Sequence, residues 1–376
     1  MKAANLLDIL IEGGIHSYCG VPDSLLSPFT DELTRRFGEA GVMHNEGGGV
    51  AYAVGYHLAT GKIPLVYLQN SGLGNIINPV CSITSPLVYG IPILYVVGFR
   101  GEANVADEPQ HVFQGSVTRE QLALLDIATF YIGPDTSEDD LRCALGRFQA
   151  LFTMGKSAAI LIGKASFEAV QGHAYKNAWS IIREAAIERI ALSTQNDIIV
   201  SSTGKISREL FELREKHGLS HRQDFLCVGA MGHDSMIALG IGLGAKERII
   251  WCIQGDGAFL MHMGQAATIG AQAPPNLRHI VLNNAAHESV GGLPSVAAAL
   301  DLCAIAKACG YQKVFCVEQM DELDACLGEM RNGNALSFME IRCAMDSRRN
   351  LIRPSLTPAE NKEMLMNNMK AVAERT

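Results

Sequence analysis

Short, continuous runs of apolar and β-branched residues recur along this chain, and helical patterns separate them. The runs lie at residues 63–68, 91–97, 158–162, 197–201, 249–253 and 279–282. They do not alternate with polar residues, which is typical of parallel strands in a sheet covered on both faces. Helical patterns occupy residues 5–12, 48–59, 208–217, 235–244 and 265–271. This alternation over the whole length predicts an α/β fold with doubly wound, mostly parallel sheets.

The length of 376 residues suggests two domains of similar size. Residues 166–195 are polar and helical in pattern and carry no strand signal, so they suit a connector. We therefore expect one domain at residues 1–170, a linker at 171–195 and a second domain at 196–376. A helical tail over residues 357–375 is expected to lie on the surface or at a subunit contact.

Charge and composition exclude several kinds of partner. The net charge is −8 and no Lys/Arg run occurs, which argues against nucleic acid and membrane surfaces as partners. The ten cysteines are dispersed without a CxxC pair, and Cys303, Cys309 and Cys316 lack zinc-site spacing.

The N-terminal residues form an amphipathic pattern with acidic positions, unlike a signal peptide, and no apolar run is long enough to span a bilayer. We expect a cytoplasmic protein.

Two polar motifs follow two of the apolar runs. Gly255-Asp256-Gly257 comes directly after one predicted strand, and Asn283-Asn284 comes after the next. Ligands of open α/β sheets bind at the carboxyl ends of strands, so neighbouring strands would bring Asp256 and Asn284 together. Their oxygens, with a nearby backbone carbonyl, suit Mg²⁺, and the glycines allow a diphosphate to approach the backbone. Taken separately, the first motif also fits an ordinary turn and the second a strand-end cap.

The spacing of 28 positions from Asp256 to Asn284 resembles the motif of the thiamine-diphosphate enzymes. This resemblance implies that Asp256, Asn284 and the backbone carbonyl of Ala286 bind Mg²⁺. It also implies that Glu46, in "HNEGGG", hydrogen-bonds N1′ of the aminopyrimidine ring, although a glutamate there also suits a helix N-terminus. The backbone carbonyl of Gly229 would accept from the 4′-amino group, and Met231 would hold the cofactor bent. The other cofactor-binding residues implied are Ser71, Gly72, Thr203, Gly204, Gly255, Gly257 and Ala258, together with Asn284.

Longer stretches resemble one group within these enzymes, the phosphonopyruvate decarboxylases. They include "GVPDSLLSPF", "NEGGGVAYAVGYHLATGK", "QNSGLGN", "DEPQHVFQG" and "STGKISRELFEL", and they occur in both halves of the chain. The resemblance implies two thiamine-diphosphate-binding domains, one for the pyrimidine and one for the diphosphate, without a central third domain. It also implies conversion of 3-phosphonopyruvate to phosphonoacetaldehyde and CO₂ in phosphonate biosynthesis. The sulfopyruvate decarboxylases share much of the pattern.

The same resemblance implies roles around the substrate. Asp23, in "GVPDS", and His111, in "EPQH", are expected to move protons during the reaction, although they also suit a turn cap and a surface histidine. Residues expected to line the substrate pocket are Ser24, Gln110, Arg100, Lys205 and Glu288.

Some positions depart from the family pattern and keep alternatives open. Phe113 stands where the family places a basic residue, and Ala285, Val290 and Leu293 are more apolar than expected. These differences admit sulfopyruvate or a modified phosphono- or phosphino-oxo acid as substrate. A homologue that binds the cofactor without activity, for regulation, and a Mg²⁺-dependent phosphotransfer enzyme are alternatives of other classes. Related enzymes build each site from two subunits, so a homo-oligomer of at least two chains is expected.

Overall fold

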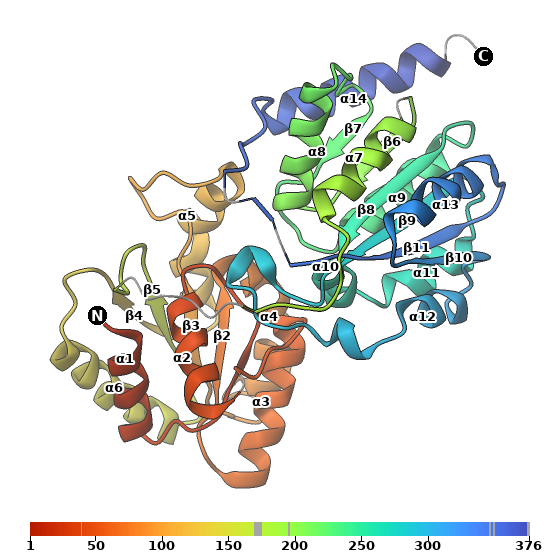
Figure 1. The fold of residues 1–376 in the computed structure, drawn as a ribbon. Coiled ribbons are helices and arrows are strands. Elements are labelled where there is room, and N and C mark those ends of the chain that lie inside the picture. Colours follow the sequence, from red (N-terminus) through yellow and green to blue (C-terminus); the bar gives the residue numbers. More distant parts are fainter. Residues whose placement is uncertain (39, 169–174, 195, 346, 349, 374–376) are drawn as a thin grey trace. The chain divides into compact units, whose positions relative to one another are not determined.

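The computed structural model describes residues 1–38, 40–168, 175–194, 196–345, 347–348 and 350–373, with the side chains described up to residue 370. The chain divides into two compact units (Figure 1). Unit 1 comprises Met1–Ala174 with Val290–Leu293, and unit 2 comprises Tyr175–Ser289 with Pro294–Thr376. Each unit contains one sheet whose strand pairs are all parallel, which confirms the predicted two-sheet α/β fold.

Unit 1 has a five-stranded sheet in the order β1-β2-β3-β5-β4. Its elements are α1 (Ala3–Glu12), β1 (Tyr18–Gly20), α2 (Ser27–Phe37), α3 (Glu46–Thr60), β2 (Leu65–Gln69), η1 (Asn70–Gly72), α4 (Leu73–Pro79), η2 (Val80–Thr84), β3 (Leu94–Gly98), α5 (Pro109–Leu124), β4 (Ala128–Ile132), α6 (Glu138–Thr153) and β5 (Ala158–Ile162). One buried cluster joins α3 and α4 to alternate residues of the central strands. The continuous apolarity of these strands follows, because side chains on both faces are buried.

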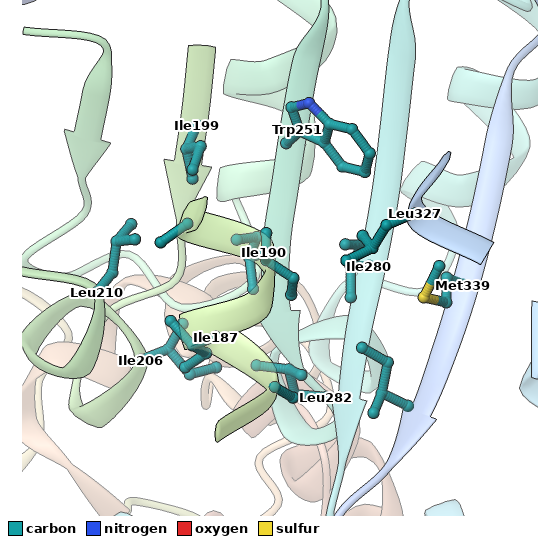
Figure 2. Packing of buried hydrophobic residues seen from close by; sticks show 14 of the residues in the cluster. Ile187, Ile190, Ile199, Ile206, Leu210, Trp251, Ile280, Leu282, Leu327 and Met339 are labelled. Atoms are coloured by element: carbon teal, nitrogen blue, oxygen red, sulfur yellow. The ribbon is translucent and has the colours of Figure 1, made fainter. Parts of the chain in front are cut away.

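Unit 2 has a six-stranded sheet in the order β10-β11-β9-β8-β6-β7. Its elements are α7 (Arg183–Ser193), β6 (Ile198–Ser201), α8 (Lys205–Lys216), β7 (Asp224–Leu226), α9 (Asp234–Gly244), β8 (Ile250–Gly255), α10 (Asp256–Met261), α11 (Gln265–Gln272), β9 (Leu277–Asn283), η3 (Glu288–Val290), η4 (Val296–Ala299), α12 (Leu302–Ala308), β10 (Lys313–Val317), α13 (Met320–Asn332), β11 (Ser337–Arg342) and α14 (Pro358–Ala373). Helices α7, α8 and α13 cover one face of this sheet (Figure 2). Helices α9, α11, α12 and α14 contribute to the cluster on the other face.

Helix α7 lies within the stretch expected to be a linker. Its residues Ala186, Ile187 and Ile190 are fully buried in the core of unit 2, and Figure 2 shows Ile187 and Ile190 among them. The amphipathic pattern that suggested a polar connector therefore has an apolar face, and this face packs on the sheet. Residues 169–174 and 195 of the expected linker lie outside the described residues.

Among the described residues, no helix is both long and apolar enough to cross a membrane. All ten cysteines lie in the described part of the chain, and all are free thiols.

Candidate active site

The functional motifs of unit 2 gather where its strand order reverses. Strand β6 lies between β7 and β8, so the chain leaves β6 toward one edge and then returns to the other side. Ligands of such sheets bind off the carboxyl ends of the strands at this reversal point. Here β6 leads into the N-terminus of α8, and β8 leads directly into α10. Two helix N-termini, which favour anions, thus follow the two strands at the reversal.

Asp256 opens α10 and is buried. Its Oδ2 accepts a 2.5 Å hydrogen bond from Ser295 Oγ, and its carboxylate also accepts from the backbone N–H of Asn284. Burial raises the pKa of Asp256 to about 6, because the charged form loses hydration that these hydrogen bonds only partly replace. A bound cation would restore this lost stabilisation, so the position suits a metal ligand.

Asn284 follows β9, the neighbour of β8, and its orientation is fixed by its own loop. Its Nδ2 donates to Glu288 Oε2 at 3.0 Å, and its Oδ1 accepts from the backbone N–H of Ala286 at 3.1 Å. Because the amide nitrogen is held by Glu288, the oxygen is the atom left to face a cation. Ala286 forms a bridge with Pro294. The structure thus brings Asp256, Asn284 and Ala286 into one loop cluster, as the sequence motif predicts.

Glu288 is itself held by two cations. Its Oε2 accepts from Arg183 Nη1 at 2.6 Å, and its Oε1 accepts from Ser347 Oγ at 2.6 Å and lies 3.9 Å from Lys205 Nζ. Burial opposes ionisation of Glu288, but the charges of Arg183 and Lys205 and the hydrogen bonds from Ser347 and Arg183 together outweigh it and lower the pKa of this carboxyl. Arg183 also pairs with Glu209. Both carboxylate oxygens of Glu288 thus already have partners within unit 2.

One of the glycines expected at the diphosphate, Gly204, has backbone angles that favour its residue type. Gly204 caps α8 with φ of 91° and ψ of −134°, a conformation that L side chains rarely adopt. A Cβ on Gly257 would lie 3.3 Å from the ring of His287. Met231 is half-buried and stands between Ala230 and Gly232, which both have positive φ. Thr203 and Gly229 lie in the same loops, after β6 and β7 respectively, and Ala258 is buried in α10.

Glu46 begins α3 in unit 1 and is buried. Asn45 caps the helix, and Asn75 Nδ2 donates to Glu46 Oε2 at 2.7 Å. Burial raises the pKa of Glu46, although the Asn75 hydrogen bond opposes this shift. A Cβ on Gly72 would lie 2.4 Å from Glu46 Oε1, so only glycine leaves room for the carboxyl here. The neighbouring Ser71 donates to Gln69 at 2.6 Å.

Asp23 lies at the carboxyl end of the unit 1 sheet. It is fully buried after β1, and Gln69 Nε2, at the end of β2, donates to its Oδ1 at 2.5 Å. A Cβ on Gly98, at the end of β3, would lie 2.1 Å from Asp23 Oδ2. Three adjacent strand ends therefore enclose this acid. Burial raises the pKa of Asp23, against the opposing hydrogen bond of Gln69 and the charge of Arg100.

Arg100 and His111 share one carboxylate. Arg100 binds Asp107 through Nε at 2.8 Å and Nη2 at 2.5 Å, and its Nη1 donates to Ser24 Oγ at 2.8 Å. His111 Nδ1 lies 2.8 Å from Asp107 Oδ1, which leaves Nε2 as the ring atom open to other partners. Burial would raise the pKa of Asp107, but the hydrogen bonds from Arg100 and His111 lower it well below its ordinary value. Asp23, Ser24, Arg100 and His111 thus lie in one cluster of unit 1.

Three other positions singled out in the sequence have fewer contacts with the site residues described above. Gln110 lies one residue before His111, and its Oε1 is buried without a hydrogen-bond partner among the described residues. Phe113, placed by the family pattern at a basic position, is 72% exposed in this chain. Lys205 opens α8 and donates to Ser347.

Sequence reasoning missed the residues that hold the predicted ones, among them Gln69 at Asp23 and Ser347 at Glu288. Asn75 binds Glu46, Ser295 binds Asp256, Asp107 binds Arg100 and His111, and Arg183 binds Glu288. Asp107 lies within the quoted "DEPQH" stretch, so that motif carried a signal for it. Ser295 and Arg183 have no comparable signal, because they reach their partners across 39 and 105 positions.

These residues fit thiamine diphosphate and Mg²⁺. The carboxylate of Asp256, the Asn284 amide oxygen and the Ala286 carbonyl offer only hard oxygen donors, the set that Mg²⁺ prefers. The absence of a side chain at Gly72 leaves the Glu46 carboxyl its place at the start of α3, where it can meet a ring nitrogen.

Comparisons with known proteins point the same way. Residues 1–124 match the N-terminal TPP binding domain of the thiamine pyrophosphate enzymes, and residues 203–341 match the C-terminal TPP binding domain. A phosphonopyruvate decarboxylase of Streptomyces viridochromogenes is 34% identical over 95% of this chain and 92% of its own length. The phosphonopyruvate decarboxylase of Streptomyces hygroscopicus is 32% identical over 96% and 92%. A sulfopyruvate decarboxylase of Methanosarcina acetivorans is 25% identical over 95% and 92%. The chain therefore belongs to the thiamine pyrophosphate enzymes, as a homologue of the phosphonopyruvate decarboxylases with the sulfopyruvate decarboxylases as a sister group.

Proposed function

We propose that this protein decarboxylates 3-phosphonopyruvate to phosphonoacetaldehyde and CO₂, with thiamine diphosphate and Mg²⁺, in phosphonate biosynthesis. The observation that carries this proposal is the 34% identity to a phosphonopyruvate decarboxylase along almost the full length of both chains. The sulfopyruvate decarboxylase that matches equally long stretches is 25% identical, which favours the phosphono acid. The Glu46 and Asp256 clusters of the two units support the cofactor assignment.

Asp256, Asn284 and the carbonyl of Ala286 would hold Mg²⁺, and the N-termini of α8 and α10 would hold the diphosphate. When bound, thiamine diphosphate supplies the electron sink that lets the carboxylate of a 2-oxo acid leave as CO₂. Glu288 serves the metal indirectly, because it holds the amide nitrogen of Asn284, and the amide oxygen, which accepts from Ala286, keeps a second lone pair for the cation. Thr203, Gly204, Gly255 and Gly257 keep the backbone open for close approach of phosphate oxygens.

Glu46 would hold a proton for the pyrimidine ring. Burial raises its pKa, so the carboxyl retains its proton to higher pH than an exposed glutamate does. Asn75 occupies Oε2, which leaves Oε1, beside Gly72, to donate to N1′. Ser71 and Gly72 would line this end of the cofactor, while Gly229 and Met231 would support it from the loop after β7.

Asp23 and His111 would manage protons on the substrate. Burial favours the protonated form of Asp23, which can then donate to a reacting atom. His111 is oriented by Asp107 and presents Nε2. Arg100 lies between Asp107 and Ser24, so its guanidinium is the cation of this cluster best placed to attract an anionic substrate. Ser24, Gln110, Lys205 and Glu288 remain proposed as further lining of the pocket.

Sulfopyruvate is the second candidate substrate. The apolar Phe113 at a position expected to be basic reduces the positive charge available for a phosphonate, which carries more negative charge than a sulfonate. The same difference would suit a modified phosphono- or phosphino-oxo acid. A homologue that only binds the cofactor is less favoured, because Glu46, Asp256, Asn284, Asp23 and His111 are all present.

We further propose that the protein acts in the cytoplasm as a homo-oligomer of at least two chains that share their sites. Unit 1 exposes several large apolar side chains on α3 and after η2, namely Tyr52, Leu58, Leu87, Val88 and Tyr89. Apolar surface of this kind commonly mediates contact with another chain. Sedimentation of the purified protein tests this, and a monomer at assay concentration would contradict it.

The test of the reaction is CO₂ release from phosphonopyruvate, sulfopyruvate and pyruvate, each with and without thiamine diphosphate and Mg²⁺. We expect release from phosphonopyruvate that is lost when either cofactor is withdrawn. Asp256→Asn should abolish it, whereas Asp321→Asn, at an exposed position in the first turn of α13, should leave it intact. Preference for sulfopyruvate would overturn the substrate, and no release from any acid would overturn the activity.

A further inference from the structure

A second cluster of metal-binding side chains lies apart from the Asp256 site within unit 2. It consists of Cys303 in α12, Cys316 in the edge strand β10 and Glu340 in β11. Cys316 and Glu340 are register partners in neighbouring parallel strands, so their side chains lie on the same face of the sheet. Helix α12 packs in the hydrophobic cluster on that face of the sheet and contributes Cys303. The three side chains come from three different elements.

The ligand atoms of the three residues converge on one point. The two Sγ atoms and a carboxylate oxygen all lie within 4.8 Å of one another. Cys303 Sγ is 3.8 Å and Cys316 Sγ is 3.9 Å from Glu340 Oε2. A tetrahedral zinc ion with Zn–S of about 2.3 Å and Zn–O of about 2.0 Å requires S···O separations of about 3.5 Å. Both sulfur atoms therefore lie within a few tenths of an ångström of the required distance from Glu340 Oε2.

The environment of Glu340 favours a cation. This residue is 1% exposed, and a buried carboxylate is costly unless it is paired or binds a metal. Its Oε1 accepts from Asn283 Nδ2 at 2.7 Å and lies 3.5 Å from Arg342 Nε. Its Oε2 faces the two sulfur atoms, which as neutral thiols are only weak hydrogen-bond donors.

We propose that Cys303, Cys316 and Glu340 form a zinc site with water as the fourth ligand. Two thiolates select a soft divalent cation and disfavour Mg²⁺, so this site is chemically distinct from the oxygen-lined site at Asp256. Cys316 is exposed, which gives the ion and the water access. The sequence spacing gave no sign of it, because the ligands are assembled by strand register and helix packing.

Zinc at this position would stabilise the edge of the sheet and act on a residue next to the proposed cofactor site. It would tie β10 and α12 to β11, and it would fix Glu340, whose other oxygen holds Asn283. Asn283 directly precedes Asn284 at the end of β9. Because thiols must lose their protons to bind zinc, binding should weaken as the pH falls.

The test uses untagged, reduced protein stripped with a chelator and titrated with Zn²⁺, and with Co²⁺ as a spectroscopic probe. We expect one tightly bound Zn²⁺ per chain, a thiolate-to-cobalt charge-transfer band and a rise in the melting temperature. Cys316→Ser should weaken Zn²⁺ binding by more than the roughly 10–100-fold lost with an outer-shell partner, and it should remove the band. Glu340→Gln should weaken binding while retaining thiolate ligation.

Cys309→Ser is the matched control, because Cys309 caps the same helix but lies outside the cluster. It should bind Zn²⁺ as the unmodified protein does. These readouts require no turnover, so they stand apart from the test of the decarboxylase. The proposal is overturned if the reduced protein binds no Zn²⁺ stoichiometrically, if Cys316→Ser binds it unchanged, or if Cys309→Ser loses it equally.

Discussion

Replacement of Gly72 by alanine tests whether activity depends on the position of the Glu46 carboxyl. Gly72 has φ of −78° and ψ of −7°, which alanine adopts without backbone strain, so the effect is steric alone. The added Cβ would lie 2.4 Å from Glu46 Oε1, 2.7 Å from its Cδ and 2.8 Å from its Cγ. Because nonbonded carbon atoms sit about 3.5–4.0 Å apart, the carboxyl must move by roughly 1 Å.

A displacement of this size at a reacting group costs about 100-fold in rate. We expect Gly72→Ala to lower kcat for CO₂ release by about that factor, while overpacking costs about 1–3 kcal/mol of folding stability. Gly74→Ala, two positions later in α4, is the control, because its added Cβ meets nothing within 4 Å. Steady-state assays with saturating cofactor, beside thermal melts, separate the two effects. Unchanged turnover in folded Gly72→Ala would refute the reasoning about Glu46.

Three further substitutions probe the neighbours of the site. Asp107→Asn should lower kcat at least tenfold, because it removes the carboxylate that orients His111; a kcat equal to that of the unmodified enzyme would count against this role. Burial raises the pKa of Asp234 to about 6 from 3.8, so the folded state holds this proton more tightly and stability falls as pH rises through this window. Asp234→Asn should therefore stabilise unit 2 by up to about 3 kcal/mol at pH 7 and by little below pH 4, as urea unfolding would measure. Arg183→Met should cost about 3–5 kcal/mol in the same assay, since it removes the buried guanidinium that pairs with Glu209 and Glu288. Arg189→Met on the same helix should cost about 0–1 kcal/mol, because its pair with Asp324 is exposed.

Much of the fold could be predicted because its central strands are buried on both faces. Each of the six predicted runs overlaps an observed strand, with ends that differ by a few residues at most. The missed strands carry a weaker pattern. Strands β4 and β10 lie at sheet edges, where β4 fully buries only Ile132 and β10 exposes Lys313 and Cys316. Strands β1 and β7 are three residues long, and β11 interrupts its apolar run with the buried Glu340. A charge inside a strand is explained only by contacts from other elements.

The residues of the candidate site also differ in how far the sequence alone could locate them. Local pattern and spacing place Asp256 and Asn284 at the ends of neighbouring strands, where the structure has them, whereas Glu46 was selected through the family resemblance. The groups that orient them could not be found in this way. Arg183 reaches Glu288 only because α7 packs on the sheet of unit 2, inside a stretch whose polarity suggested a linker.

The most direct test of the central claim compares the enzyme with Glu46→Gln in two measurements, CO₂ release from phosphonopyruvate and affinity for thiamine diphosphate with Mg²⁺. We predict that Glu46→Gln loses at least about 100-fold in kcat, since general acid–base contributions are about 10²–10⁴-fold. Its cofactor affinity should stay close to that of the unmodified protein, because the proposed metal and diphosphate ligands lie in unit 2. Retained turnover in Glu46→Gln would contradict the account, as would an unmodified enzyme that releases CO₂ equally without the cofactor.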